Sequence, residues 1–467
     1  MRVIARTAGL PSLGRKKIEG TGASWGLIFM LLYAAVSVGR IQELIPALAP
    51  MRLGLITGGL ALFVWLKAPG SLAEKIPIAH PVVRDVMILL GLGLLTIPLG
   101  VWPGHSLEFL VGVYLKTVLL FLLVIYWCRS LDDVRRLLWV CCVAVAILVV
   151  PGVIAGQDEL ERYQGETLSY DPNDLALLFV VTLPFILYLY STSGRKARMV
   201  LVGLAMLCLY GMVLTRSRGG MLALVVVGGL ILSRSRLSRS AKWNTVAAAV
   251  IVFGILAGTA WKERIATIWD PQTEYDRTAG GRTDIWQTGL MVLLSHPWGV
   301  GIDGFVTAEG NYHGGAGKWN TAHNSFLQVA VELGVAGLLV FIRLLVETMK
   351  SIRRIEFIVK PPSRAGPGQA DQLPLWRQLK KRSKGPGDDQ GLFQLSEAME
   401  ISIWGFLVAG FFLSQAYNSM LYIMLALAVV CLRFTQDVSS GAATGTQRWR
   451  LLPPVRDVRP RRWKAGG

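Results

Sequence analysis

The amino-acid sequence predicts an all-α, polytopic membrane protein with about twelve transmembrane helices and one large extracytoplasmic loop. The chain of 467 residues is 53% hydrophobic and only 17% charged, and its mean hydropathy is +0.48. Uncharged runs recur from end to end, and a water-soluble protein of this length has no core large enough to bury them all. The net charge of +18 is concentrated in a few segments between these runs.

Apolar stretches long enough to cross a bilayer define the predicted spans. A membrane-crossing helix needs about 20 mostly apolar residues, and a shorter stretch is tolerated where the bilayer thins. The stretch at 219–233 is short, so a half-span is an alternative there. The predicted spans are 24–41, 48–67, 85–102, 108–128, 134–156, 173–191, 197–214, 219–233, 243–261, 323–349, 398–415 and 418–434.

The basic residues orient these spans. Lys and Arg fall mostly in alternate loops, and basic loops face the cytoplasm. The excess positive charge then reflects the orientation of the spans, and nucleic acid is not needed to explain it. We therefore expect the lipid bilayer as a partner and no nucleic acid. The first stretch lacks a convincing cleavage site and is expected to be retained. The predicted organisation is a cytoplasmic N-terminus (1–23), helices one to nine (24–261), an extracytoplasmic loop (262–322), helices ten to twelve (323–434) with a basic cytoplasmic linker (350–397), and a basic cytoplasmic tail (435–467).

The sequence gives little support for metal or redox chemistry. All five cysteines lie in or beside predicted spans, without the spacing of a disulfide framework or a metal site. Asp270, Glu274 and Asp276 are close together in the outer loop, but their spacing fits no familiar cation site. We therefore predict no metal and no cofactor.

Arg216 and Arg218 stand between two apolar stretches, on the predicted outer side where basic residues are scarce. The stretch at 219–233 runs inward, so its helix N-terminus, which favours anions, lies beside them. A guanidinium group matches phosphate oxygens, and two of them suit a diphosphate. Gly219 and Gly220 would let the backbone approach such a ligand. The alternative for Arg216 is an anchor at the membrane interface.

The outer loop adds a third arginine and several tryptophans. Arg282 begins a stretch of helical spacing, 282–294, which His296-Pro297 should end, and the glycines that follow require tight turns. Trp286 in that helix could stack on a sugar or belong to an interfacial belt. Arg282 could bind the same anion or form a salt bridge with Asp284, Asp276 or Glu274.

His323 opens the next predicted span and is a candidate general base. With an unperturbed pKa of about 6.5, a histidine there could accept a proton from a hydroxyl group. In a continuous helix, His323 and Gly334 share one face, with Ala330 and Gly337 beside it, and these small residues would form a smooth groove. The alternative is a capping or interfacial histidine.

Two further segments carry polar residues of interest. Asp171-Pro172-Asn173 is typical of an N-cap with a proline opening a helix. Lys116 falls within the fourth span, and a charge inside a membrane is a functional candidate by default. The sequence does not identify a partner for Lys116.

Together these motifs resemble the O-antigen ligase and polymerase superfamily of bacterial membrane glycosyltransferases, which are of the GT-C type. The resemblance covers mainly residues 170–350, and it depends on the order and spacing of several motifs. They are the segment 40–46, Asp171-Pro172-Asn173, the arginine run 215–220, Arg282 with Trp286, His296-Pro297 with Gly299, Gly301 and Phe305, and His323-Asn324-Ser325 with Gly334.

The resemblance implies a reaction and roles for these residues. A glycan is transferred, with inversion, from undecaprenyl diphosphate to a hydroxyl of lipid A-core, protein or another glycan, at the periplasmic side of the inner membrane. Arg218, assisted by Arg216, and Arg282 would bind the diphosphate, and His323 would activate the hydroxyl. Possible donor or acceptor contacts are Asp171, Asn173, Trp286, Asp303 and Asn324.

Two other functions remain open at this point. One is an O-antigen or exopolysaccharide polymerase of the same superfamily. The other is a transporter of a small anion such as bicarbonate, with the arginines as its binding site. The chain shows no convincing internal repeat, which counts against a secondary transporter.

Overall fold

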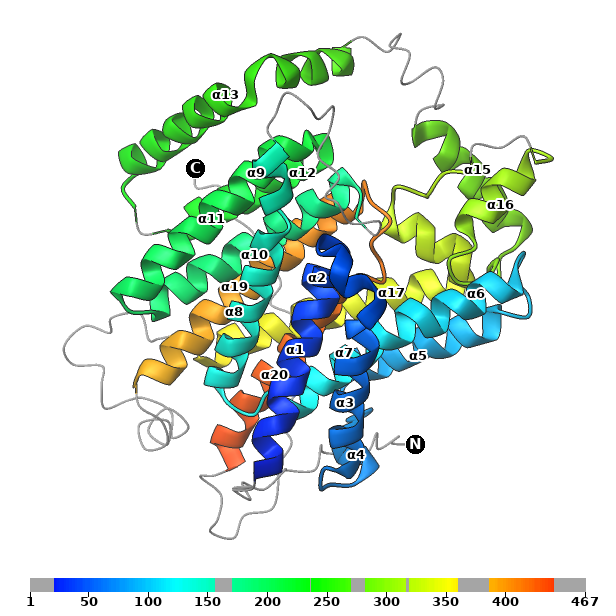
Figure 1. Cartoon of the computed structure of the whole chain (residues 1–467), viewed down its shortest axis with the longest axis horizontal. Helices are drawn as coiled ribbons and strands as arrows, with labels where there is room; N and C mark the ends of the chain where they lie inside the picture. Colours follow the sequence, from blue (N-terminus) through cyan, green and yellow to red (C-terminus); the bar gives the residue numbers. More distant parts are fainter. Residues whose placement is uncertain are drawn as a thin grey trace, which may run out of the picture.

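The computed structural model of the chain is a bundle of helices (Figure 1). It describes residues 21–155, 170–235, 237–269, 282–315, 319–359 and 386–440, and these ranges contain no strand. Several predicted features lie outside the described residues: Asp270, Glu274 and Asp276, most of the basic linker, and nearly all of the tail.

The helices have the following bounds. In chain order they are α1 (Thr21–Gly39), α2 (Ile41–Leu44), the 3-10 helix η1 (Pro46–Met51), α3 (Leu53–Lys67), α4 (Leu72–Lys75), α5 (Pro81–Thr96), α6 (Pro103–Phe109), the π-helix η2 (Leu110–Tyr114), α7 (Leu115–Trp127), α8 (Leu131–Ile147), α9 (Val150–Ala155), α10 (Pro172–Thr192), α11 (Arg195–Thr215), α12 (Arg218–Arg234), α13 (Arg239–Trp269), α15 (Arg282–Ser295), α16 (Phe305–Tyr312), α17 (Ser325–Val359), α19 (Pro386–Gly410) and α20 (Ser419–Ser440).

Every predicted apolar stretch overlaps one or more helices. α13 runs on to Trp269, past the predicted end of its span at residue 261, because charged residues such as Lys262 continue a helix as well as apolar ones do. The count of twelve crossings and the side of the large loop remain predictions. Within the described residues, six helical segments are long and apolar enough to cross a membrane: Pro103–Trp127, Leu131–Val153, Pro172–Thr192, Arg195–Thr215, Ser325–Val359 and Asp389–Gly410.

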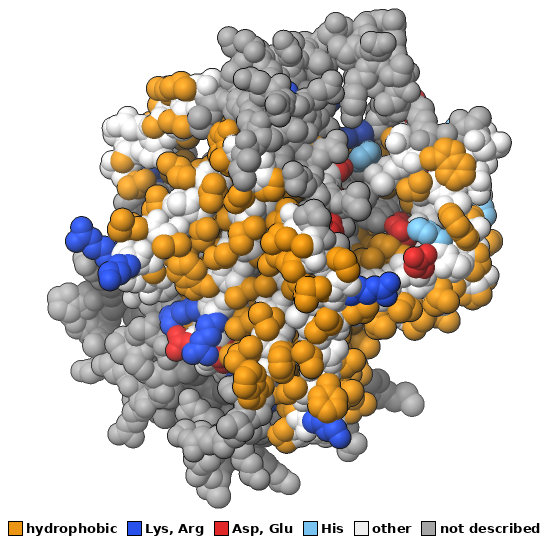
Figure 2. Space-filling view, in the orientation of Figure 1, with side chains coloured by type: hydrophobic (Ala, Val, Ile, Leu, Met, Phe, Trp, Pro, Cys, Tyr) orange, Lys and Arg blue, Asp and Glu red, His pale blue; other side chains and the backbone are white. Residues whose placement is uncertain are grey.

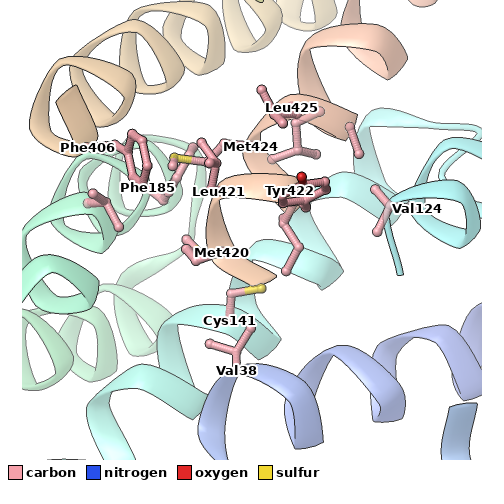
Figure 3. Close-up of a cluster of buried hydrophobic side chains, with 14 of the residues drawn as sticks. Val38, Val124, Cys141, Phe185, Phe406, Met420, Leu421, Tyr422, Met424 and Leu425 are labelled. Atoms are coloured by element: carbon pink, nitrogen blue, oxygen red, sulfur yellow. The ribbon is translucent and has the colours of Figure 1, made fainter. Parts of the chain in front are cut away.

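α20 lies at the centre of the hydrophobic core. From Met420 to Phe434 its hydrophobic side chains are buried. A helix that is apolar on all sides needs partners all round. Figure 3 shows α20 side chains beside residues of five other helices: Val38 of α1, Val124 of α7, Cys141 of α8, Phe185 of α10 and Phe406 of α19.

The outside of the bundle is also apolar. Figure 2 shows a face covered largely by hydrophobic side chains, with charged side chains few among them. On α13, Val250, Ile251 and Ile255 are 64%, 61% and 74% exposed. Lipid tails are as apolar as a protein core, so such a surface suits a bilayer. The chain is a multi-pass membrane protein.

One end of the bundle holds paired charges. The Glu400 carboxylate of α19 accepts hydrogen bonds from Arg234 at the end of α12 and from Arg353 of α17, the latter at 3.2 Å. These contacts join three helices. The opposite end contains the start of α10, α12 and α17, where the predicted site residues lie.

Candidate active site

Arg216 and Arg218 lie on a tight turn between α11 and α12. Arg216 follows the last residue of α11 and has a left-handed backbone, with φ at +48°. Ser217 is the N-cap of α12, and its hydroxyl accepts a hydrogen bond of 3.2 Å from the Gly220 N–H. Arg218 is the first residue of α12. The two arginines thus flank a helix N-terminus, an arrangement that favours an anion.

The start of α10 supports this turn. Asp171 caps α10, because its carboxylate accepts hydrogen bonds from the backbone N–H groups of Asn173 (2.6 Å) and Asp174 (2.8 Å). The Asn173 side-chain oxygen in turn accepts a hydrogen bond of 2.7 Å from Ser217 Oγ. Ser217 is fully buried and Asn173 is 8% exposed. The structure therefore gives Asn173 a positioning role for the arginine turn.

Gly219 and Gly220 serve packing. A Cβ on Gly219 would lie 3.1 Å from the Cβ of Phe412, and a Cβ on Gly220 would lie 2.5 Å from that of Ala176. The structure gives both glycines a packing role, because neighbouring side chains fill the space that a Cβ would need.

The α19–α20 loop, residues 411–418, brings the arginines of two distant segments together. The Phe412 side chain packs against Gly219, the neighbour of Arg218. The Arg282 guanidinium lies over the same ring, with Cζ 5.7 Å from the ring centroid. This cation–π contact holds Arg282, at the start of α15, beside the arginine turn.

The same loop contacts the segment that carries His323. Ser325 Oγ donates a hydrogen bond of 2.6 Å to the Leu413 carbonyl. Trp286 of α15 packs against Phe411, with ring centroids 5.5 Å apart. Its Nε1 donates a hydrogen bond of 3.0 Å to the Ala322 carbonyl. Trp286 thus fixes α15 to the residues before His323, and these internal contacts account for its partly buried ring.

His323 lies just ahead of α17. Its φ is +44°, and α17 begins at Ser325. Its Nδ1 is 3.5 Å from Thr321 Oγ1. Asn324 is 7% exposed, and its side-chain oxygen accepts hydrogen bonds of 2.9 and 3.0 Å from the N–H groups two and three residues on. Our prediction that His323 opens the helix was wrong, because Asn324 caps it.

Gly334 interrupts α17, so the predicted continuous face from His323 to Gly334 is also wrong. The backbone of Gly334 has a φ of +73°. The loop after α15 pairs with the break: the Val335 N–H donates to the Pro297 carbonyl at 2.9 Å. A Cβ on Gly299 would lie 2.8 Å from Gly334 N, and one on Gly334 would lie 2.5 Å from the Pro297 oxygen. The loop thus needs glycine on both sides of this junction.

Glu332 links this junction to the α19–α20 loop. It is 1% exposed and accepts a hydrogen bond of 2.8 Å from the Tyr417 hydroxyl. It also accepts one from the backbone N–H of Asp303. The Asp303 carboxylate lies 3.0 Å from His105 Nε2. Burial raises the pKa of Asp303, and His105 opposes that shift.

Sequence reasoning missed the α19–α20 loop because it extended the span of α19 to residue 415, whereas α19 ends at Gly410. The available signal was the polar pair Ser414-Gln415 between two apolar runs. Within the described residues, Ser414 Oγ is buried without a hydrogen-bond partner. No three His, Cys, Asp or Glu side chains in those ranges are grouped as a metal site.

One segment of the chain is similar to a known protein family. Residues 203–342 match the family described as O-Antigen ligase. A search of curated proteins gives no match. The matched segment runs from α11 into α17 and contains Arg216, Arg218, Arg282 and His323. This partial match supports a relationship to the O-antigen ligase superfamily, whose members are membrane enzymes of the ligase and polymerase type.

Proposed function

We propose that this protein is an O-antigen ligase-like glycosyltransferase. It moves a glycan from undecaprenyl diphosphate to an acceptor hydroxyl of lipid A-core, protein or glycan, on the outer face of the bacterial cytoplasmic membrane. The reaction inverts the anomeric centre and needs no metal or cofactor.

In this proposal, Arg216, Arg218 and Arg282 bind the diphosphate, and His323 is the general base. The acceptor oxygen bonds to the anomeric carbon as the bond from that carbon to the diphosphate oxygen breaks. The hydroxyl proton passes to His323, and the electron pair leaves with the diphosphate. The arginines stabilise the charge that develops on the leaving group.

The shared contact of Phe412 with Gly219 and with the Arg282 guanidinium is the observation that carries the proposal. It supports a single cationic site built from α12 and α15. The Ser325 and Trp286 contacts support placing His323 near that site, because they fix its flanking residues to the same loop. Transfer of a glycan from a diphosphate requires a base for the acceptor hydroxyl and, beside it, a site that binds the diphosphate.

Turnover and donor binding test the two roles separately. The purified protein, in lipid nanodiscs, is given an undecaprenyl diphosphate-linked glycan and candidate acceptors. We expect His323→Ala to lower turnover by about 100-fold or more while donor binding is kept. Arg218→Gln should weaken donor binding about tenfold. His313→Ala changes an exposed histidine and is the control. Full turnover by His323→Ala would overturn the base assignment.

The acceptor separates the ligase from the polymerase. Transfer to lipid A-core or protein supports the ligase, and transfer to a second lipid-linked glycan supports the polymerase. Uptake of bicarbonate into vesicles without release of undecaprenyl diphosphate would instead favour the transporter.

Cysteine labelling tests the side of the membrane. All five native cysteines are buried, so they should give little background. Ser217 is fully buried and is a poor labelling position, whereas Thr321 and Lys350 are exposed. We expect an impermeant reagent added outside to label Thr321→Cys and not Lys350→Cys. The reverse pattern would place the site in the cytoplasm.

A further inference from the structure

We propose a second anion site, formed by Arg40, Arg52 and Lys116, which binds the diphosphate of a lipid-linked acceptor. It rests on the proposed function in its polymerase form, in which the acceptor glycan is itself carried on a lipid diphosphate, and it supplies the site for that second substrate. The three side chains come from the end of α1, the start of α3 and the start of α7.

Tyr33 holds these three helices together. Its hydroxyl donates a hydrogen bond of 3.0 Å to the Lys116 carbonyl. Its ring packs on α3 so closely that a Cβ on Gly58 would lie 2.8 Å from it. The charges of Arg40 and Arg52 both act on the Lys116 ammonium. The packing around Tyr33 therefore keeps three positive groups close to one another.

Within the described ranges, an acidic side chain pairs with only one of these three cations. Arg40 pairs with Glu43, with 3.2 Å between Nη1 and Oε1. Among the described residues, neither Arg52 nor Lys116 forms an ion pair. Like charges at short range repel, and an ammonium within a membrane span is costly without a counter-charge. A bound anion would relieve both costs.

The backbone supports a binding role for this cluster. Arg40 and Arg52 are both left-handed, with φ at +47° and +45°. Such a conformation costs a non-glycine residue about 1 kcal/mol or more, and it recurs at binding sites. The two strained arginines flank the segment of α2 and η1, so this short connection fixes both side chains at the same end of the bundle.

The cluster adjoins the candidate active site without being part of it. The Arg40 guanidinium lies 5.6 Å from the centroid of the Tyr170 ring, and the Tyr170 hydroxyl donates to the Val38 carbonyl at 3.2 Å. Tyr170 precedes the Asp171 cap, and the start of α10 supports the arginine turn through Asn173. This inward position of Arg40 favours a second substrate over a general bilayer lipid. Two arginines and a lysine match a diphosphate.

Counting bound lipid tests the site. The full-length protein in phosphatidylcholine nanodiscs is titrated with undecaprenyl diphosphate, and the bound molecules are counted by native mass spectrometry. We expect the wild type to bind a second molecule. Arg52→Gln/Lys116→Gln should weaken only that second binding, by about tenfold or more. Arg218→Gln/Arg282→Gln should weaken only the first. Arg195→Gln/Lys196→Gln removes the same charge from exposed positions and should keep both.

Each failure has a distinct meaning. The second site is overturned if the wild type binds a single molecule, or if Arg52→Gln/Lys116→Gln still binds the second. It is also overturned if phosphatidylglycerol displaces the second molecule with equal affinity, since the cluster would then hold any lipid phosphate. If Arg218→Gln/Arg282→Gln leaves the first binding unchanged, the proposed diphosphate clamp fails, and the Arg52 and Lys116 result still decides the second site.

Discussion

The two ends of the helix bundle hold their charged residues on different kinds of backbone. At the Glu400 end, arginines from α12 and α17 form ion pairs, and they lie in regular helices. At the other end, Arg216 and His323 have left-handed backbones beside helix termini. Strained backbone of this kind is costly and persists only where the surrounding contacts impose it. The difference is what we expect if one end stabilises the bundle and the other carries the proposed ligand site.

The left-handed residues make this contrast sharper. Within the described ranges, the non-glycine residues with positive φ are Arg40, Arg52, Arg216, Asp303, Trp319 and His323. All of them lie in connections at the end opposite Glu400. Three were site candidates from the sequence, for reasons unrelated to backbone conformation.

The largest expected effect is at the break in α17. Gly334→Ala should destabilise the fold by about 3 kcal/mol or more, because alanine disfavours this positive φ and its Cβ would meet the backbone of the Pro297 loop. Thermal unfolding in detergent and glycan transfer would both be measured. Gly229→Ala is the control, since its Cβ meets nothing within 4 Å. Equal stability of the two variants would contradict the role of the junction.

A smaller loss of stability is expected at the Glu400 end of the bundle. Glu400→Gln leaves Arg234 and Arg353 without their shared carboxylate and should cost about 1–3 kcal/mol of unfolding free energy. Transfer per folded molecule should stay the same. Glu347→Gln removes the exposed pair with Lys350 and should cost a few tenths of a kcal/mol. A loss of transfer in folded Glu400→Gln would break the proposed division between the two ends.

The smallest expected effect depends on pH. Burial lowers the pKa of His80, the N-cap of α5, to about 4. The unfolded chain takes up this proton at about pH 6.5, so stability should fall by about 1 kcal/mol between roughly pH 6.5 and 5.5. His80→Asn keeps a good cap and removes the titration. If the wild type and His80→Asn lost the same unfolding free energy over this pH range, His80 would be excluded as the cause.

The sequence by itself determined the features that depend only on residues close together in the chain. Apolar runs located the helices, because transfer to lipid depends on local composition. Asp171-Pro172 marked the start of α10, and His296-Pro297 marked the end of α15, because caps and prolines act within one turn. The arginines beside the start of α12 followed from the same local reasoning.

Only the tertiary structure decided which segments meet. Phe412 joins Gly219 and Arg282, and the Pro297 loop occupies the break at Gly334, where a continuous helix face was expected. These contacts link residues far apart in the chain, so no local periodicity encodes them. The second contact forms because the buried backbone of a broken helix needs hydrogen-bond partners, and a distant loop supplies them.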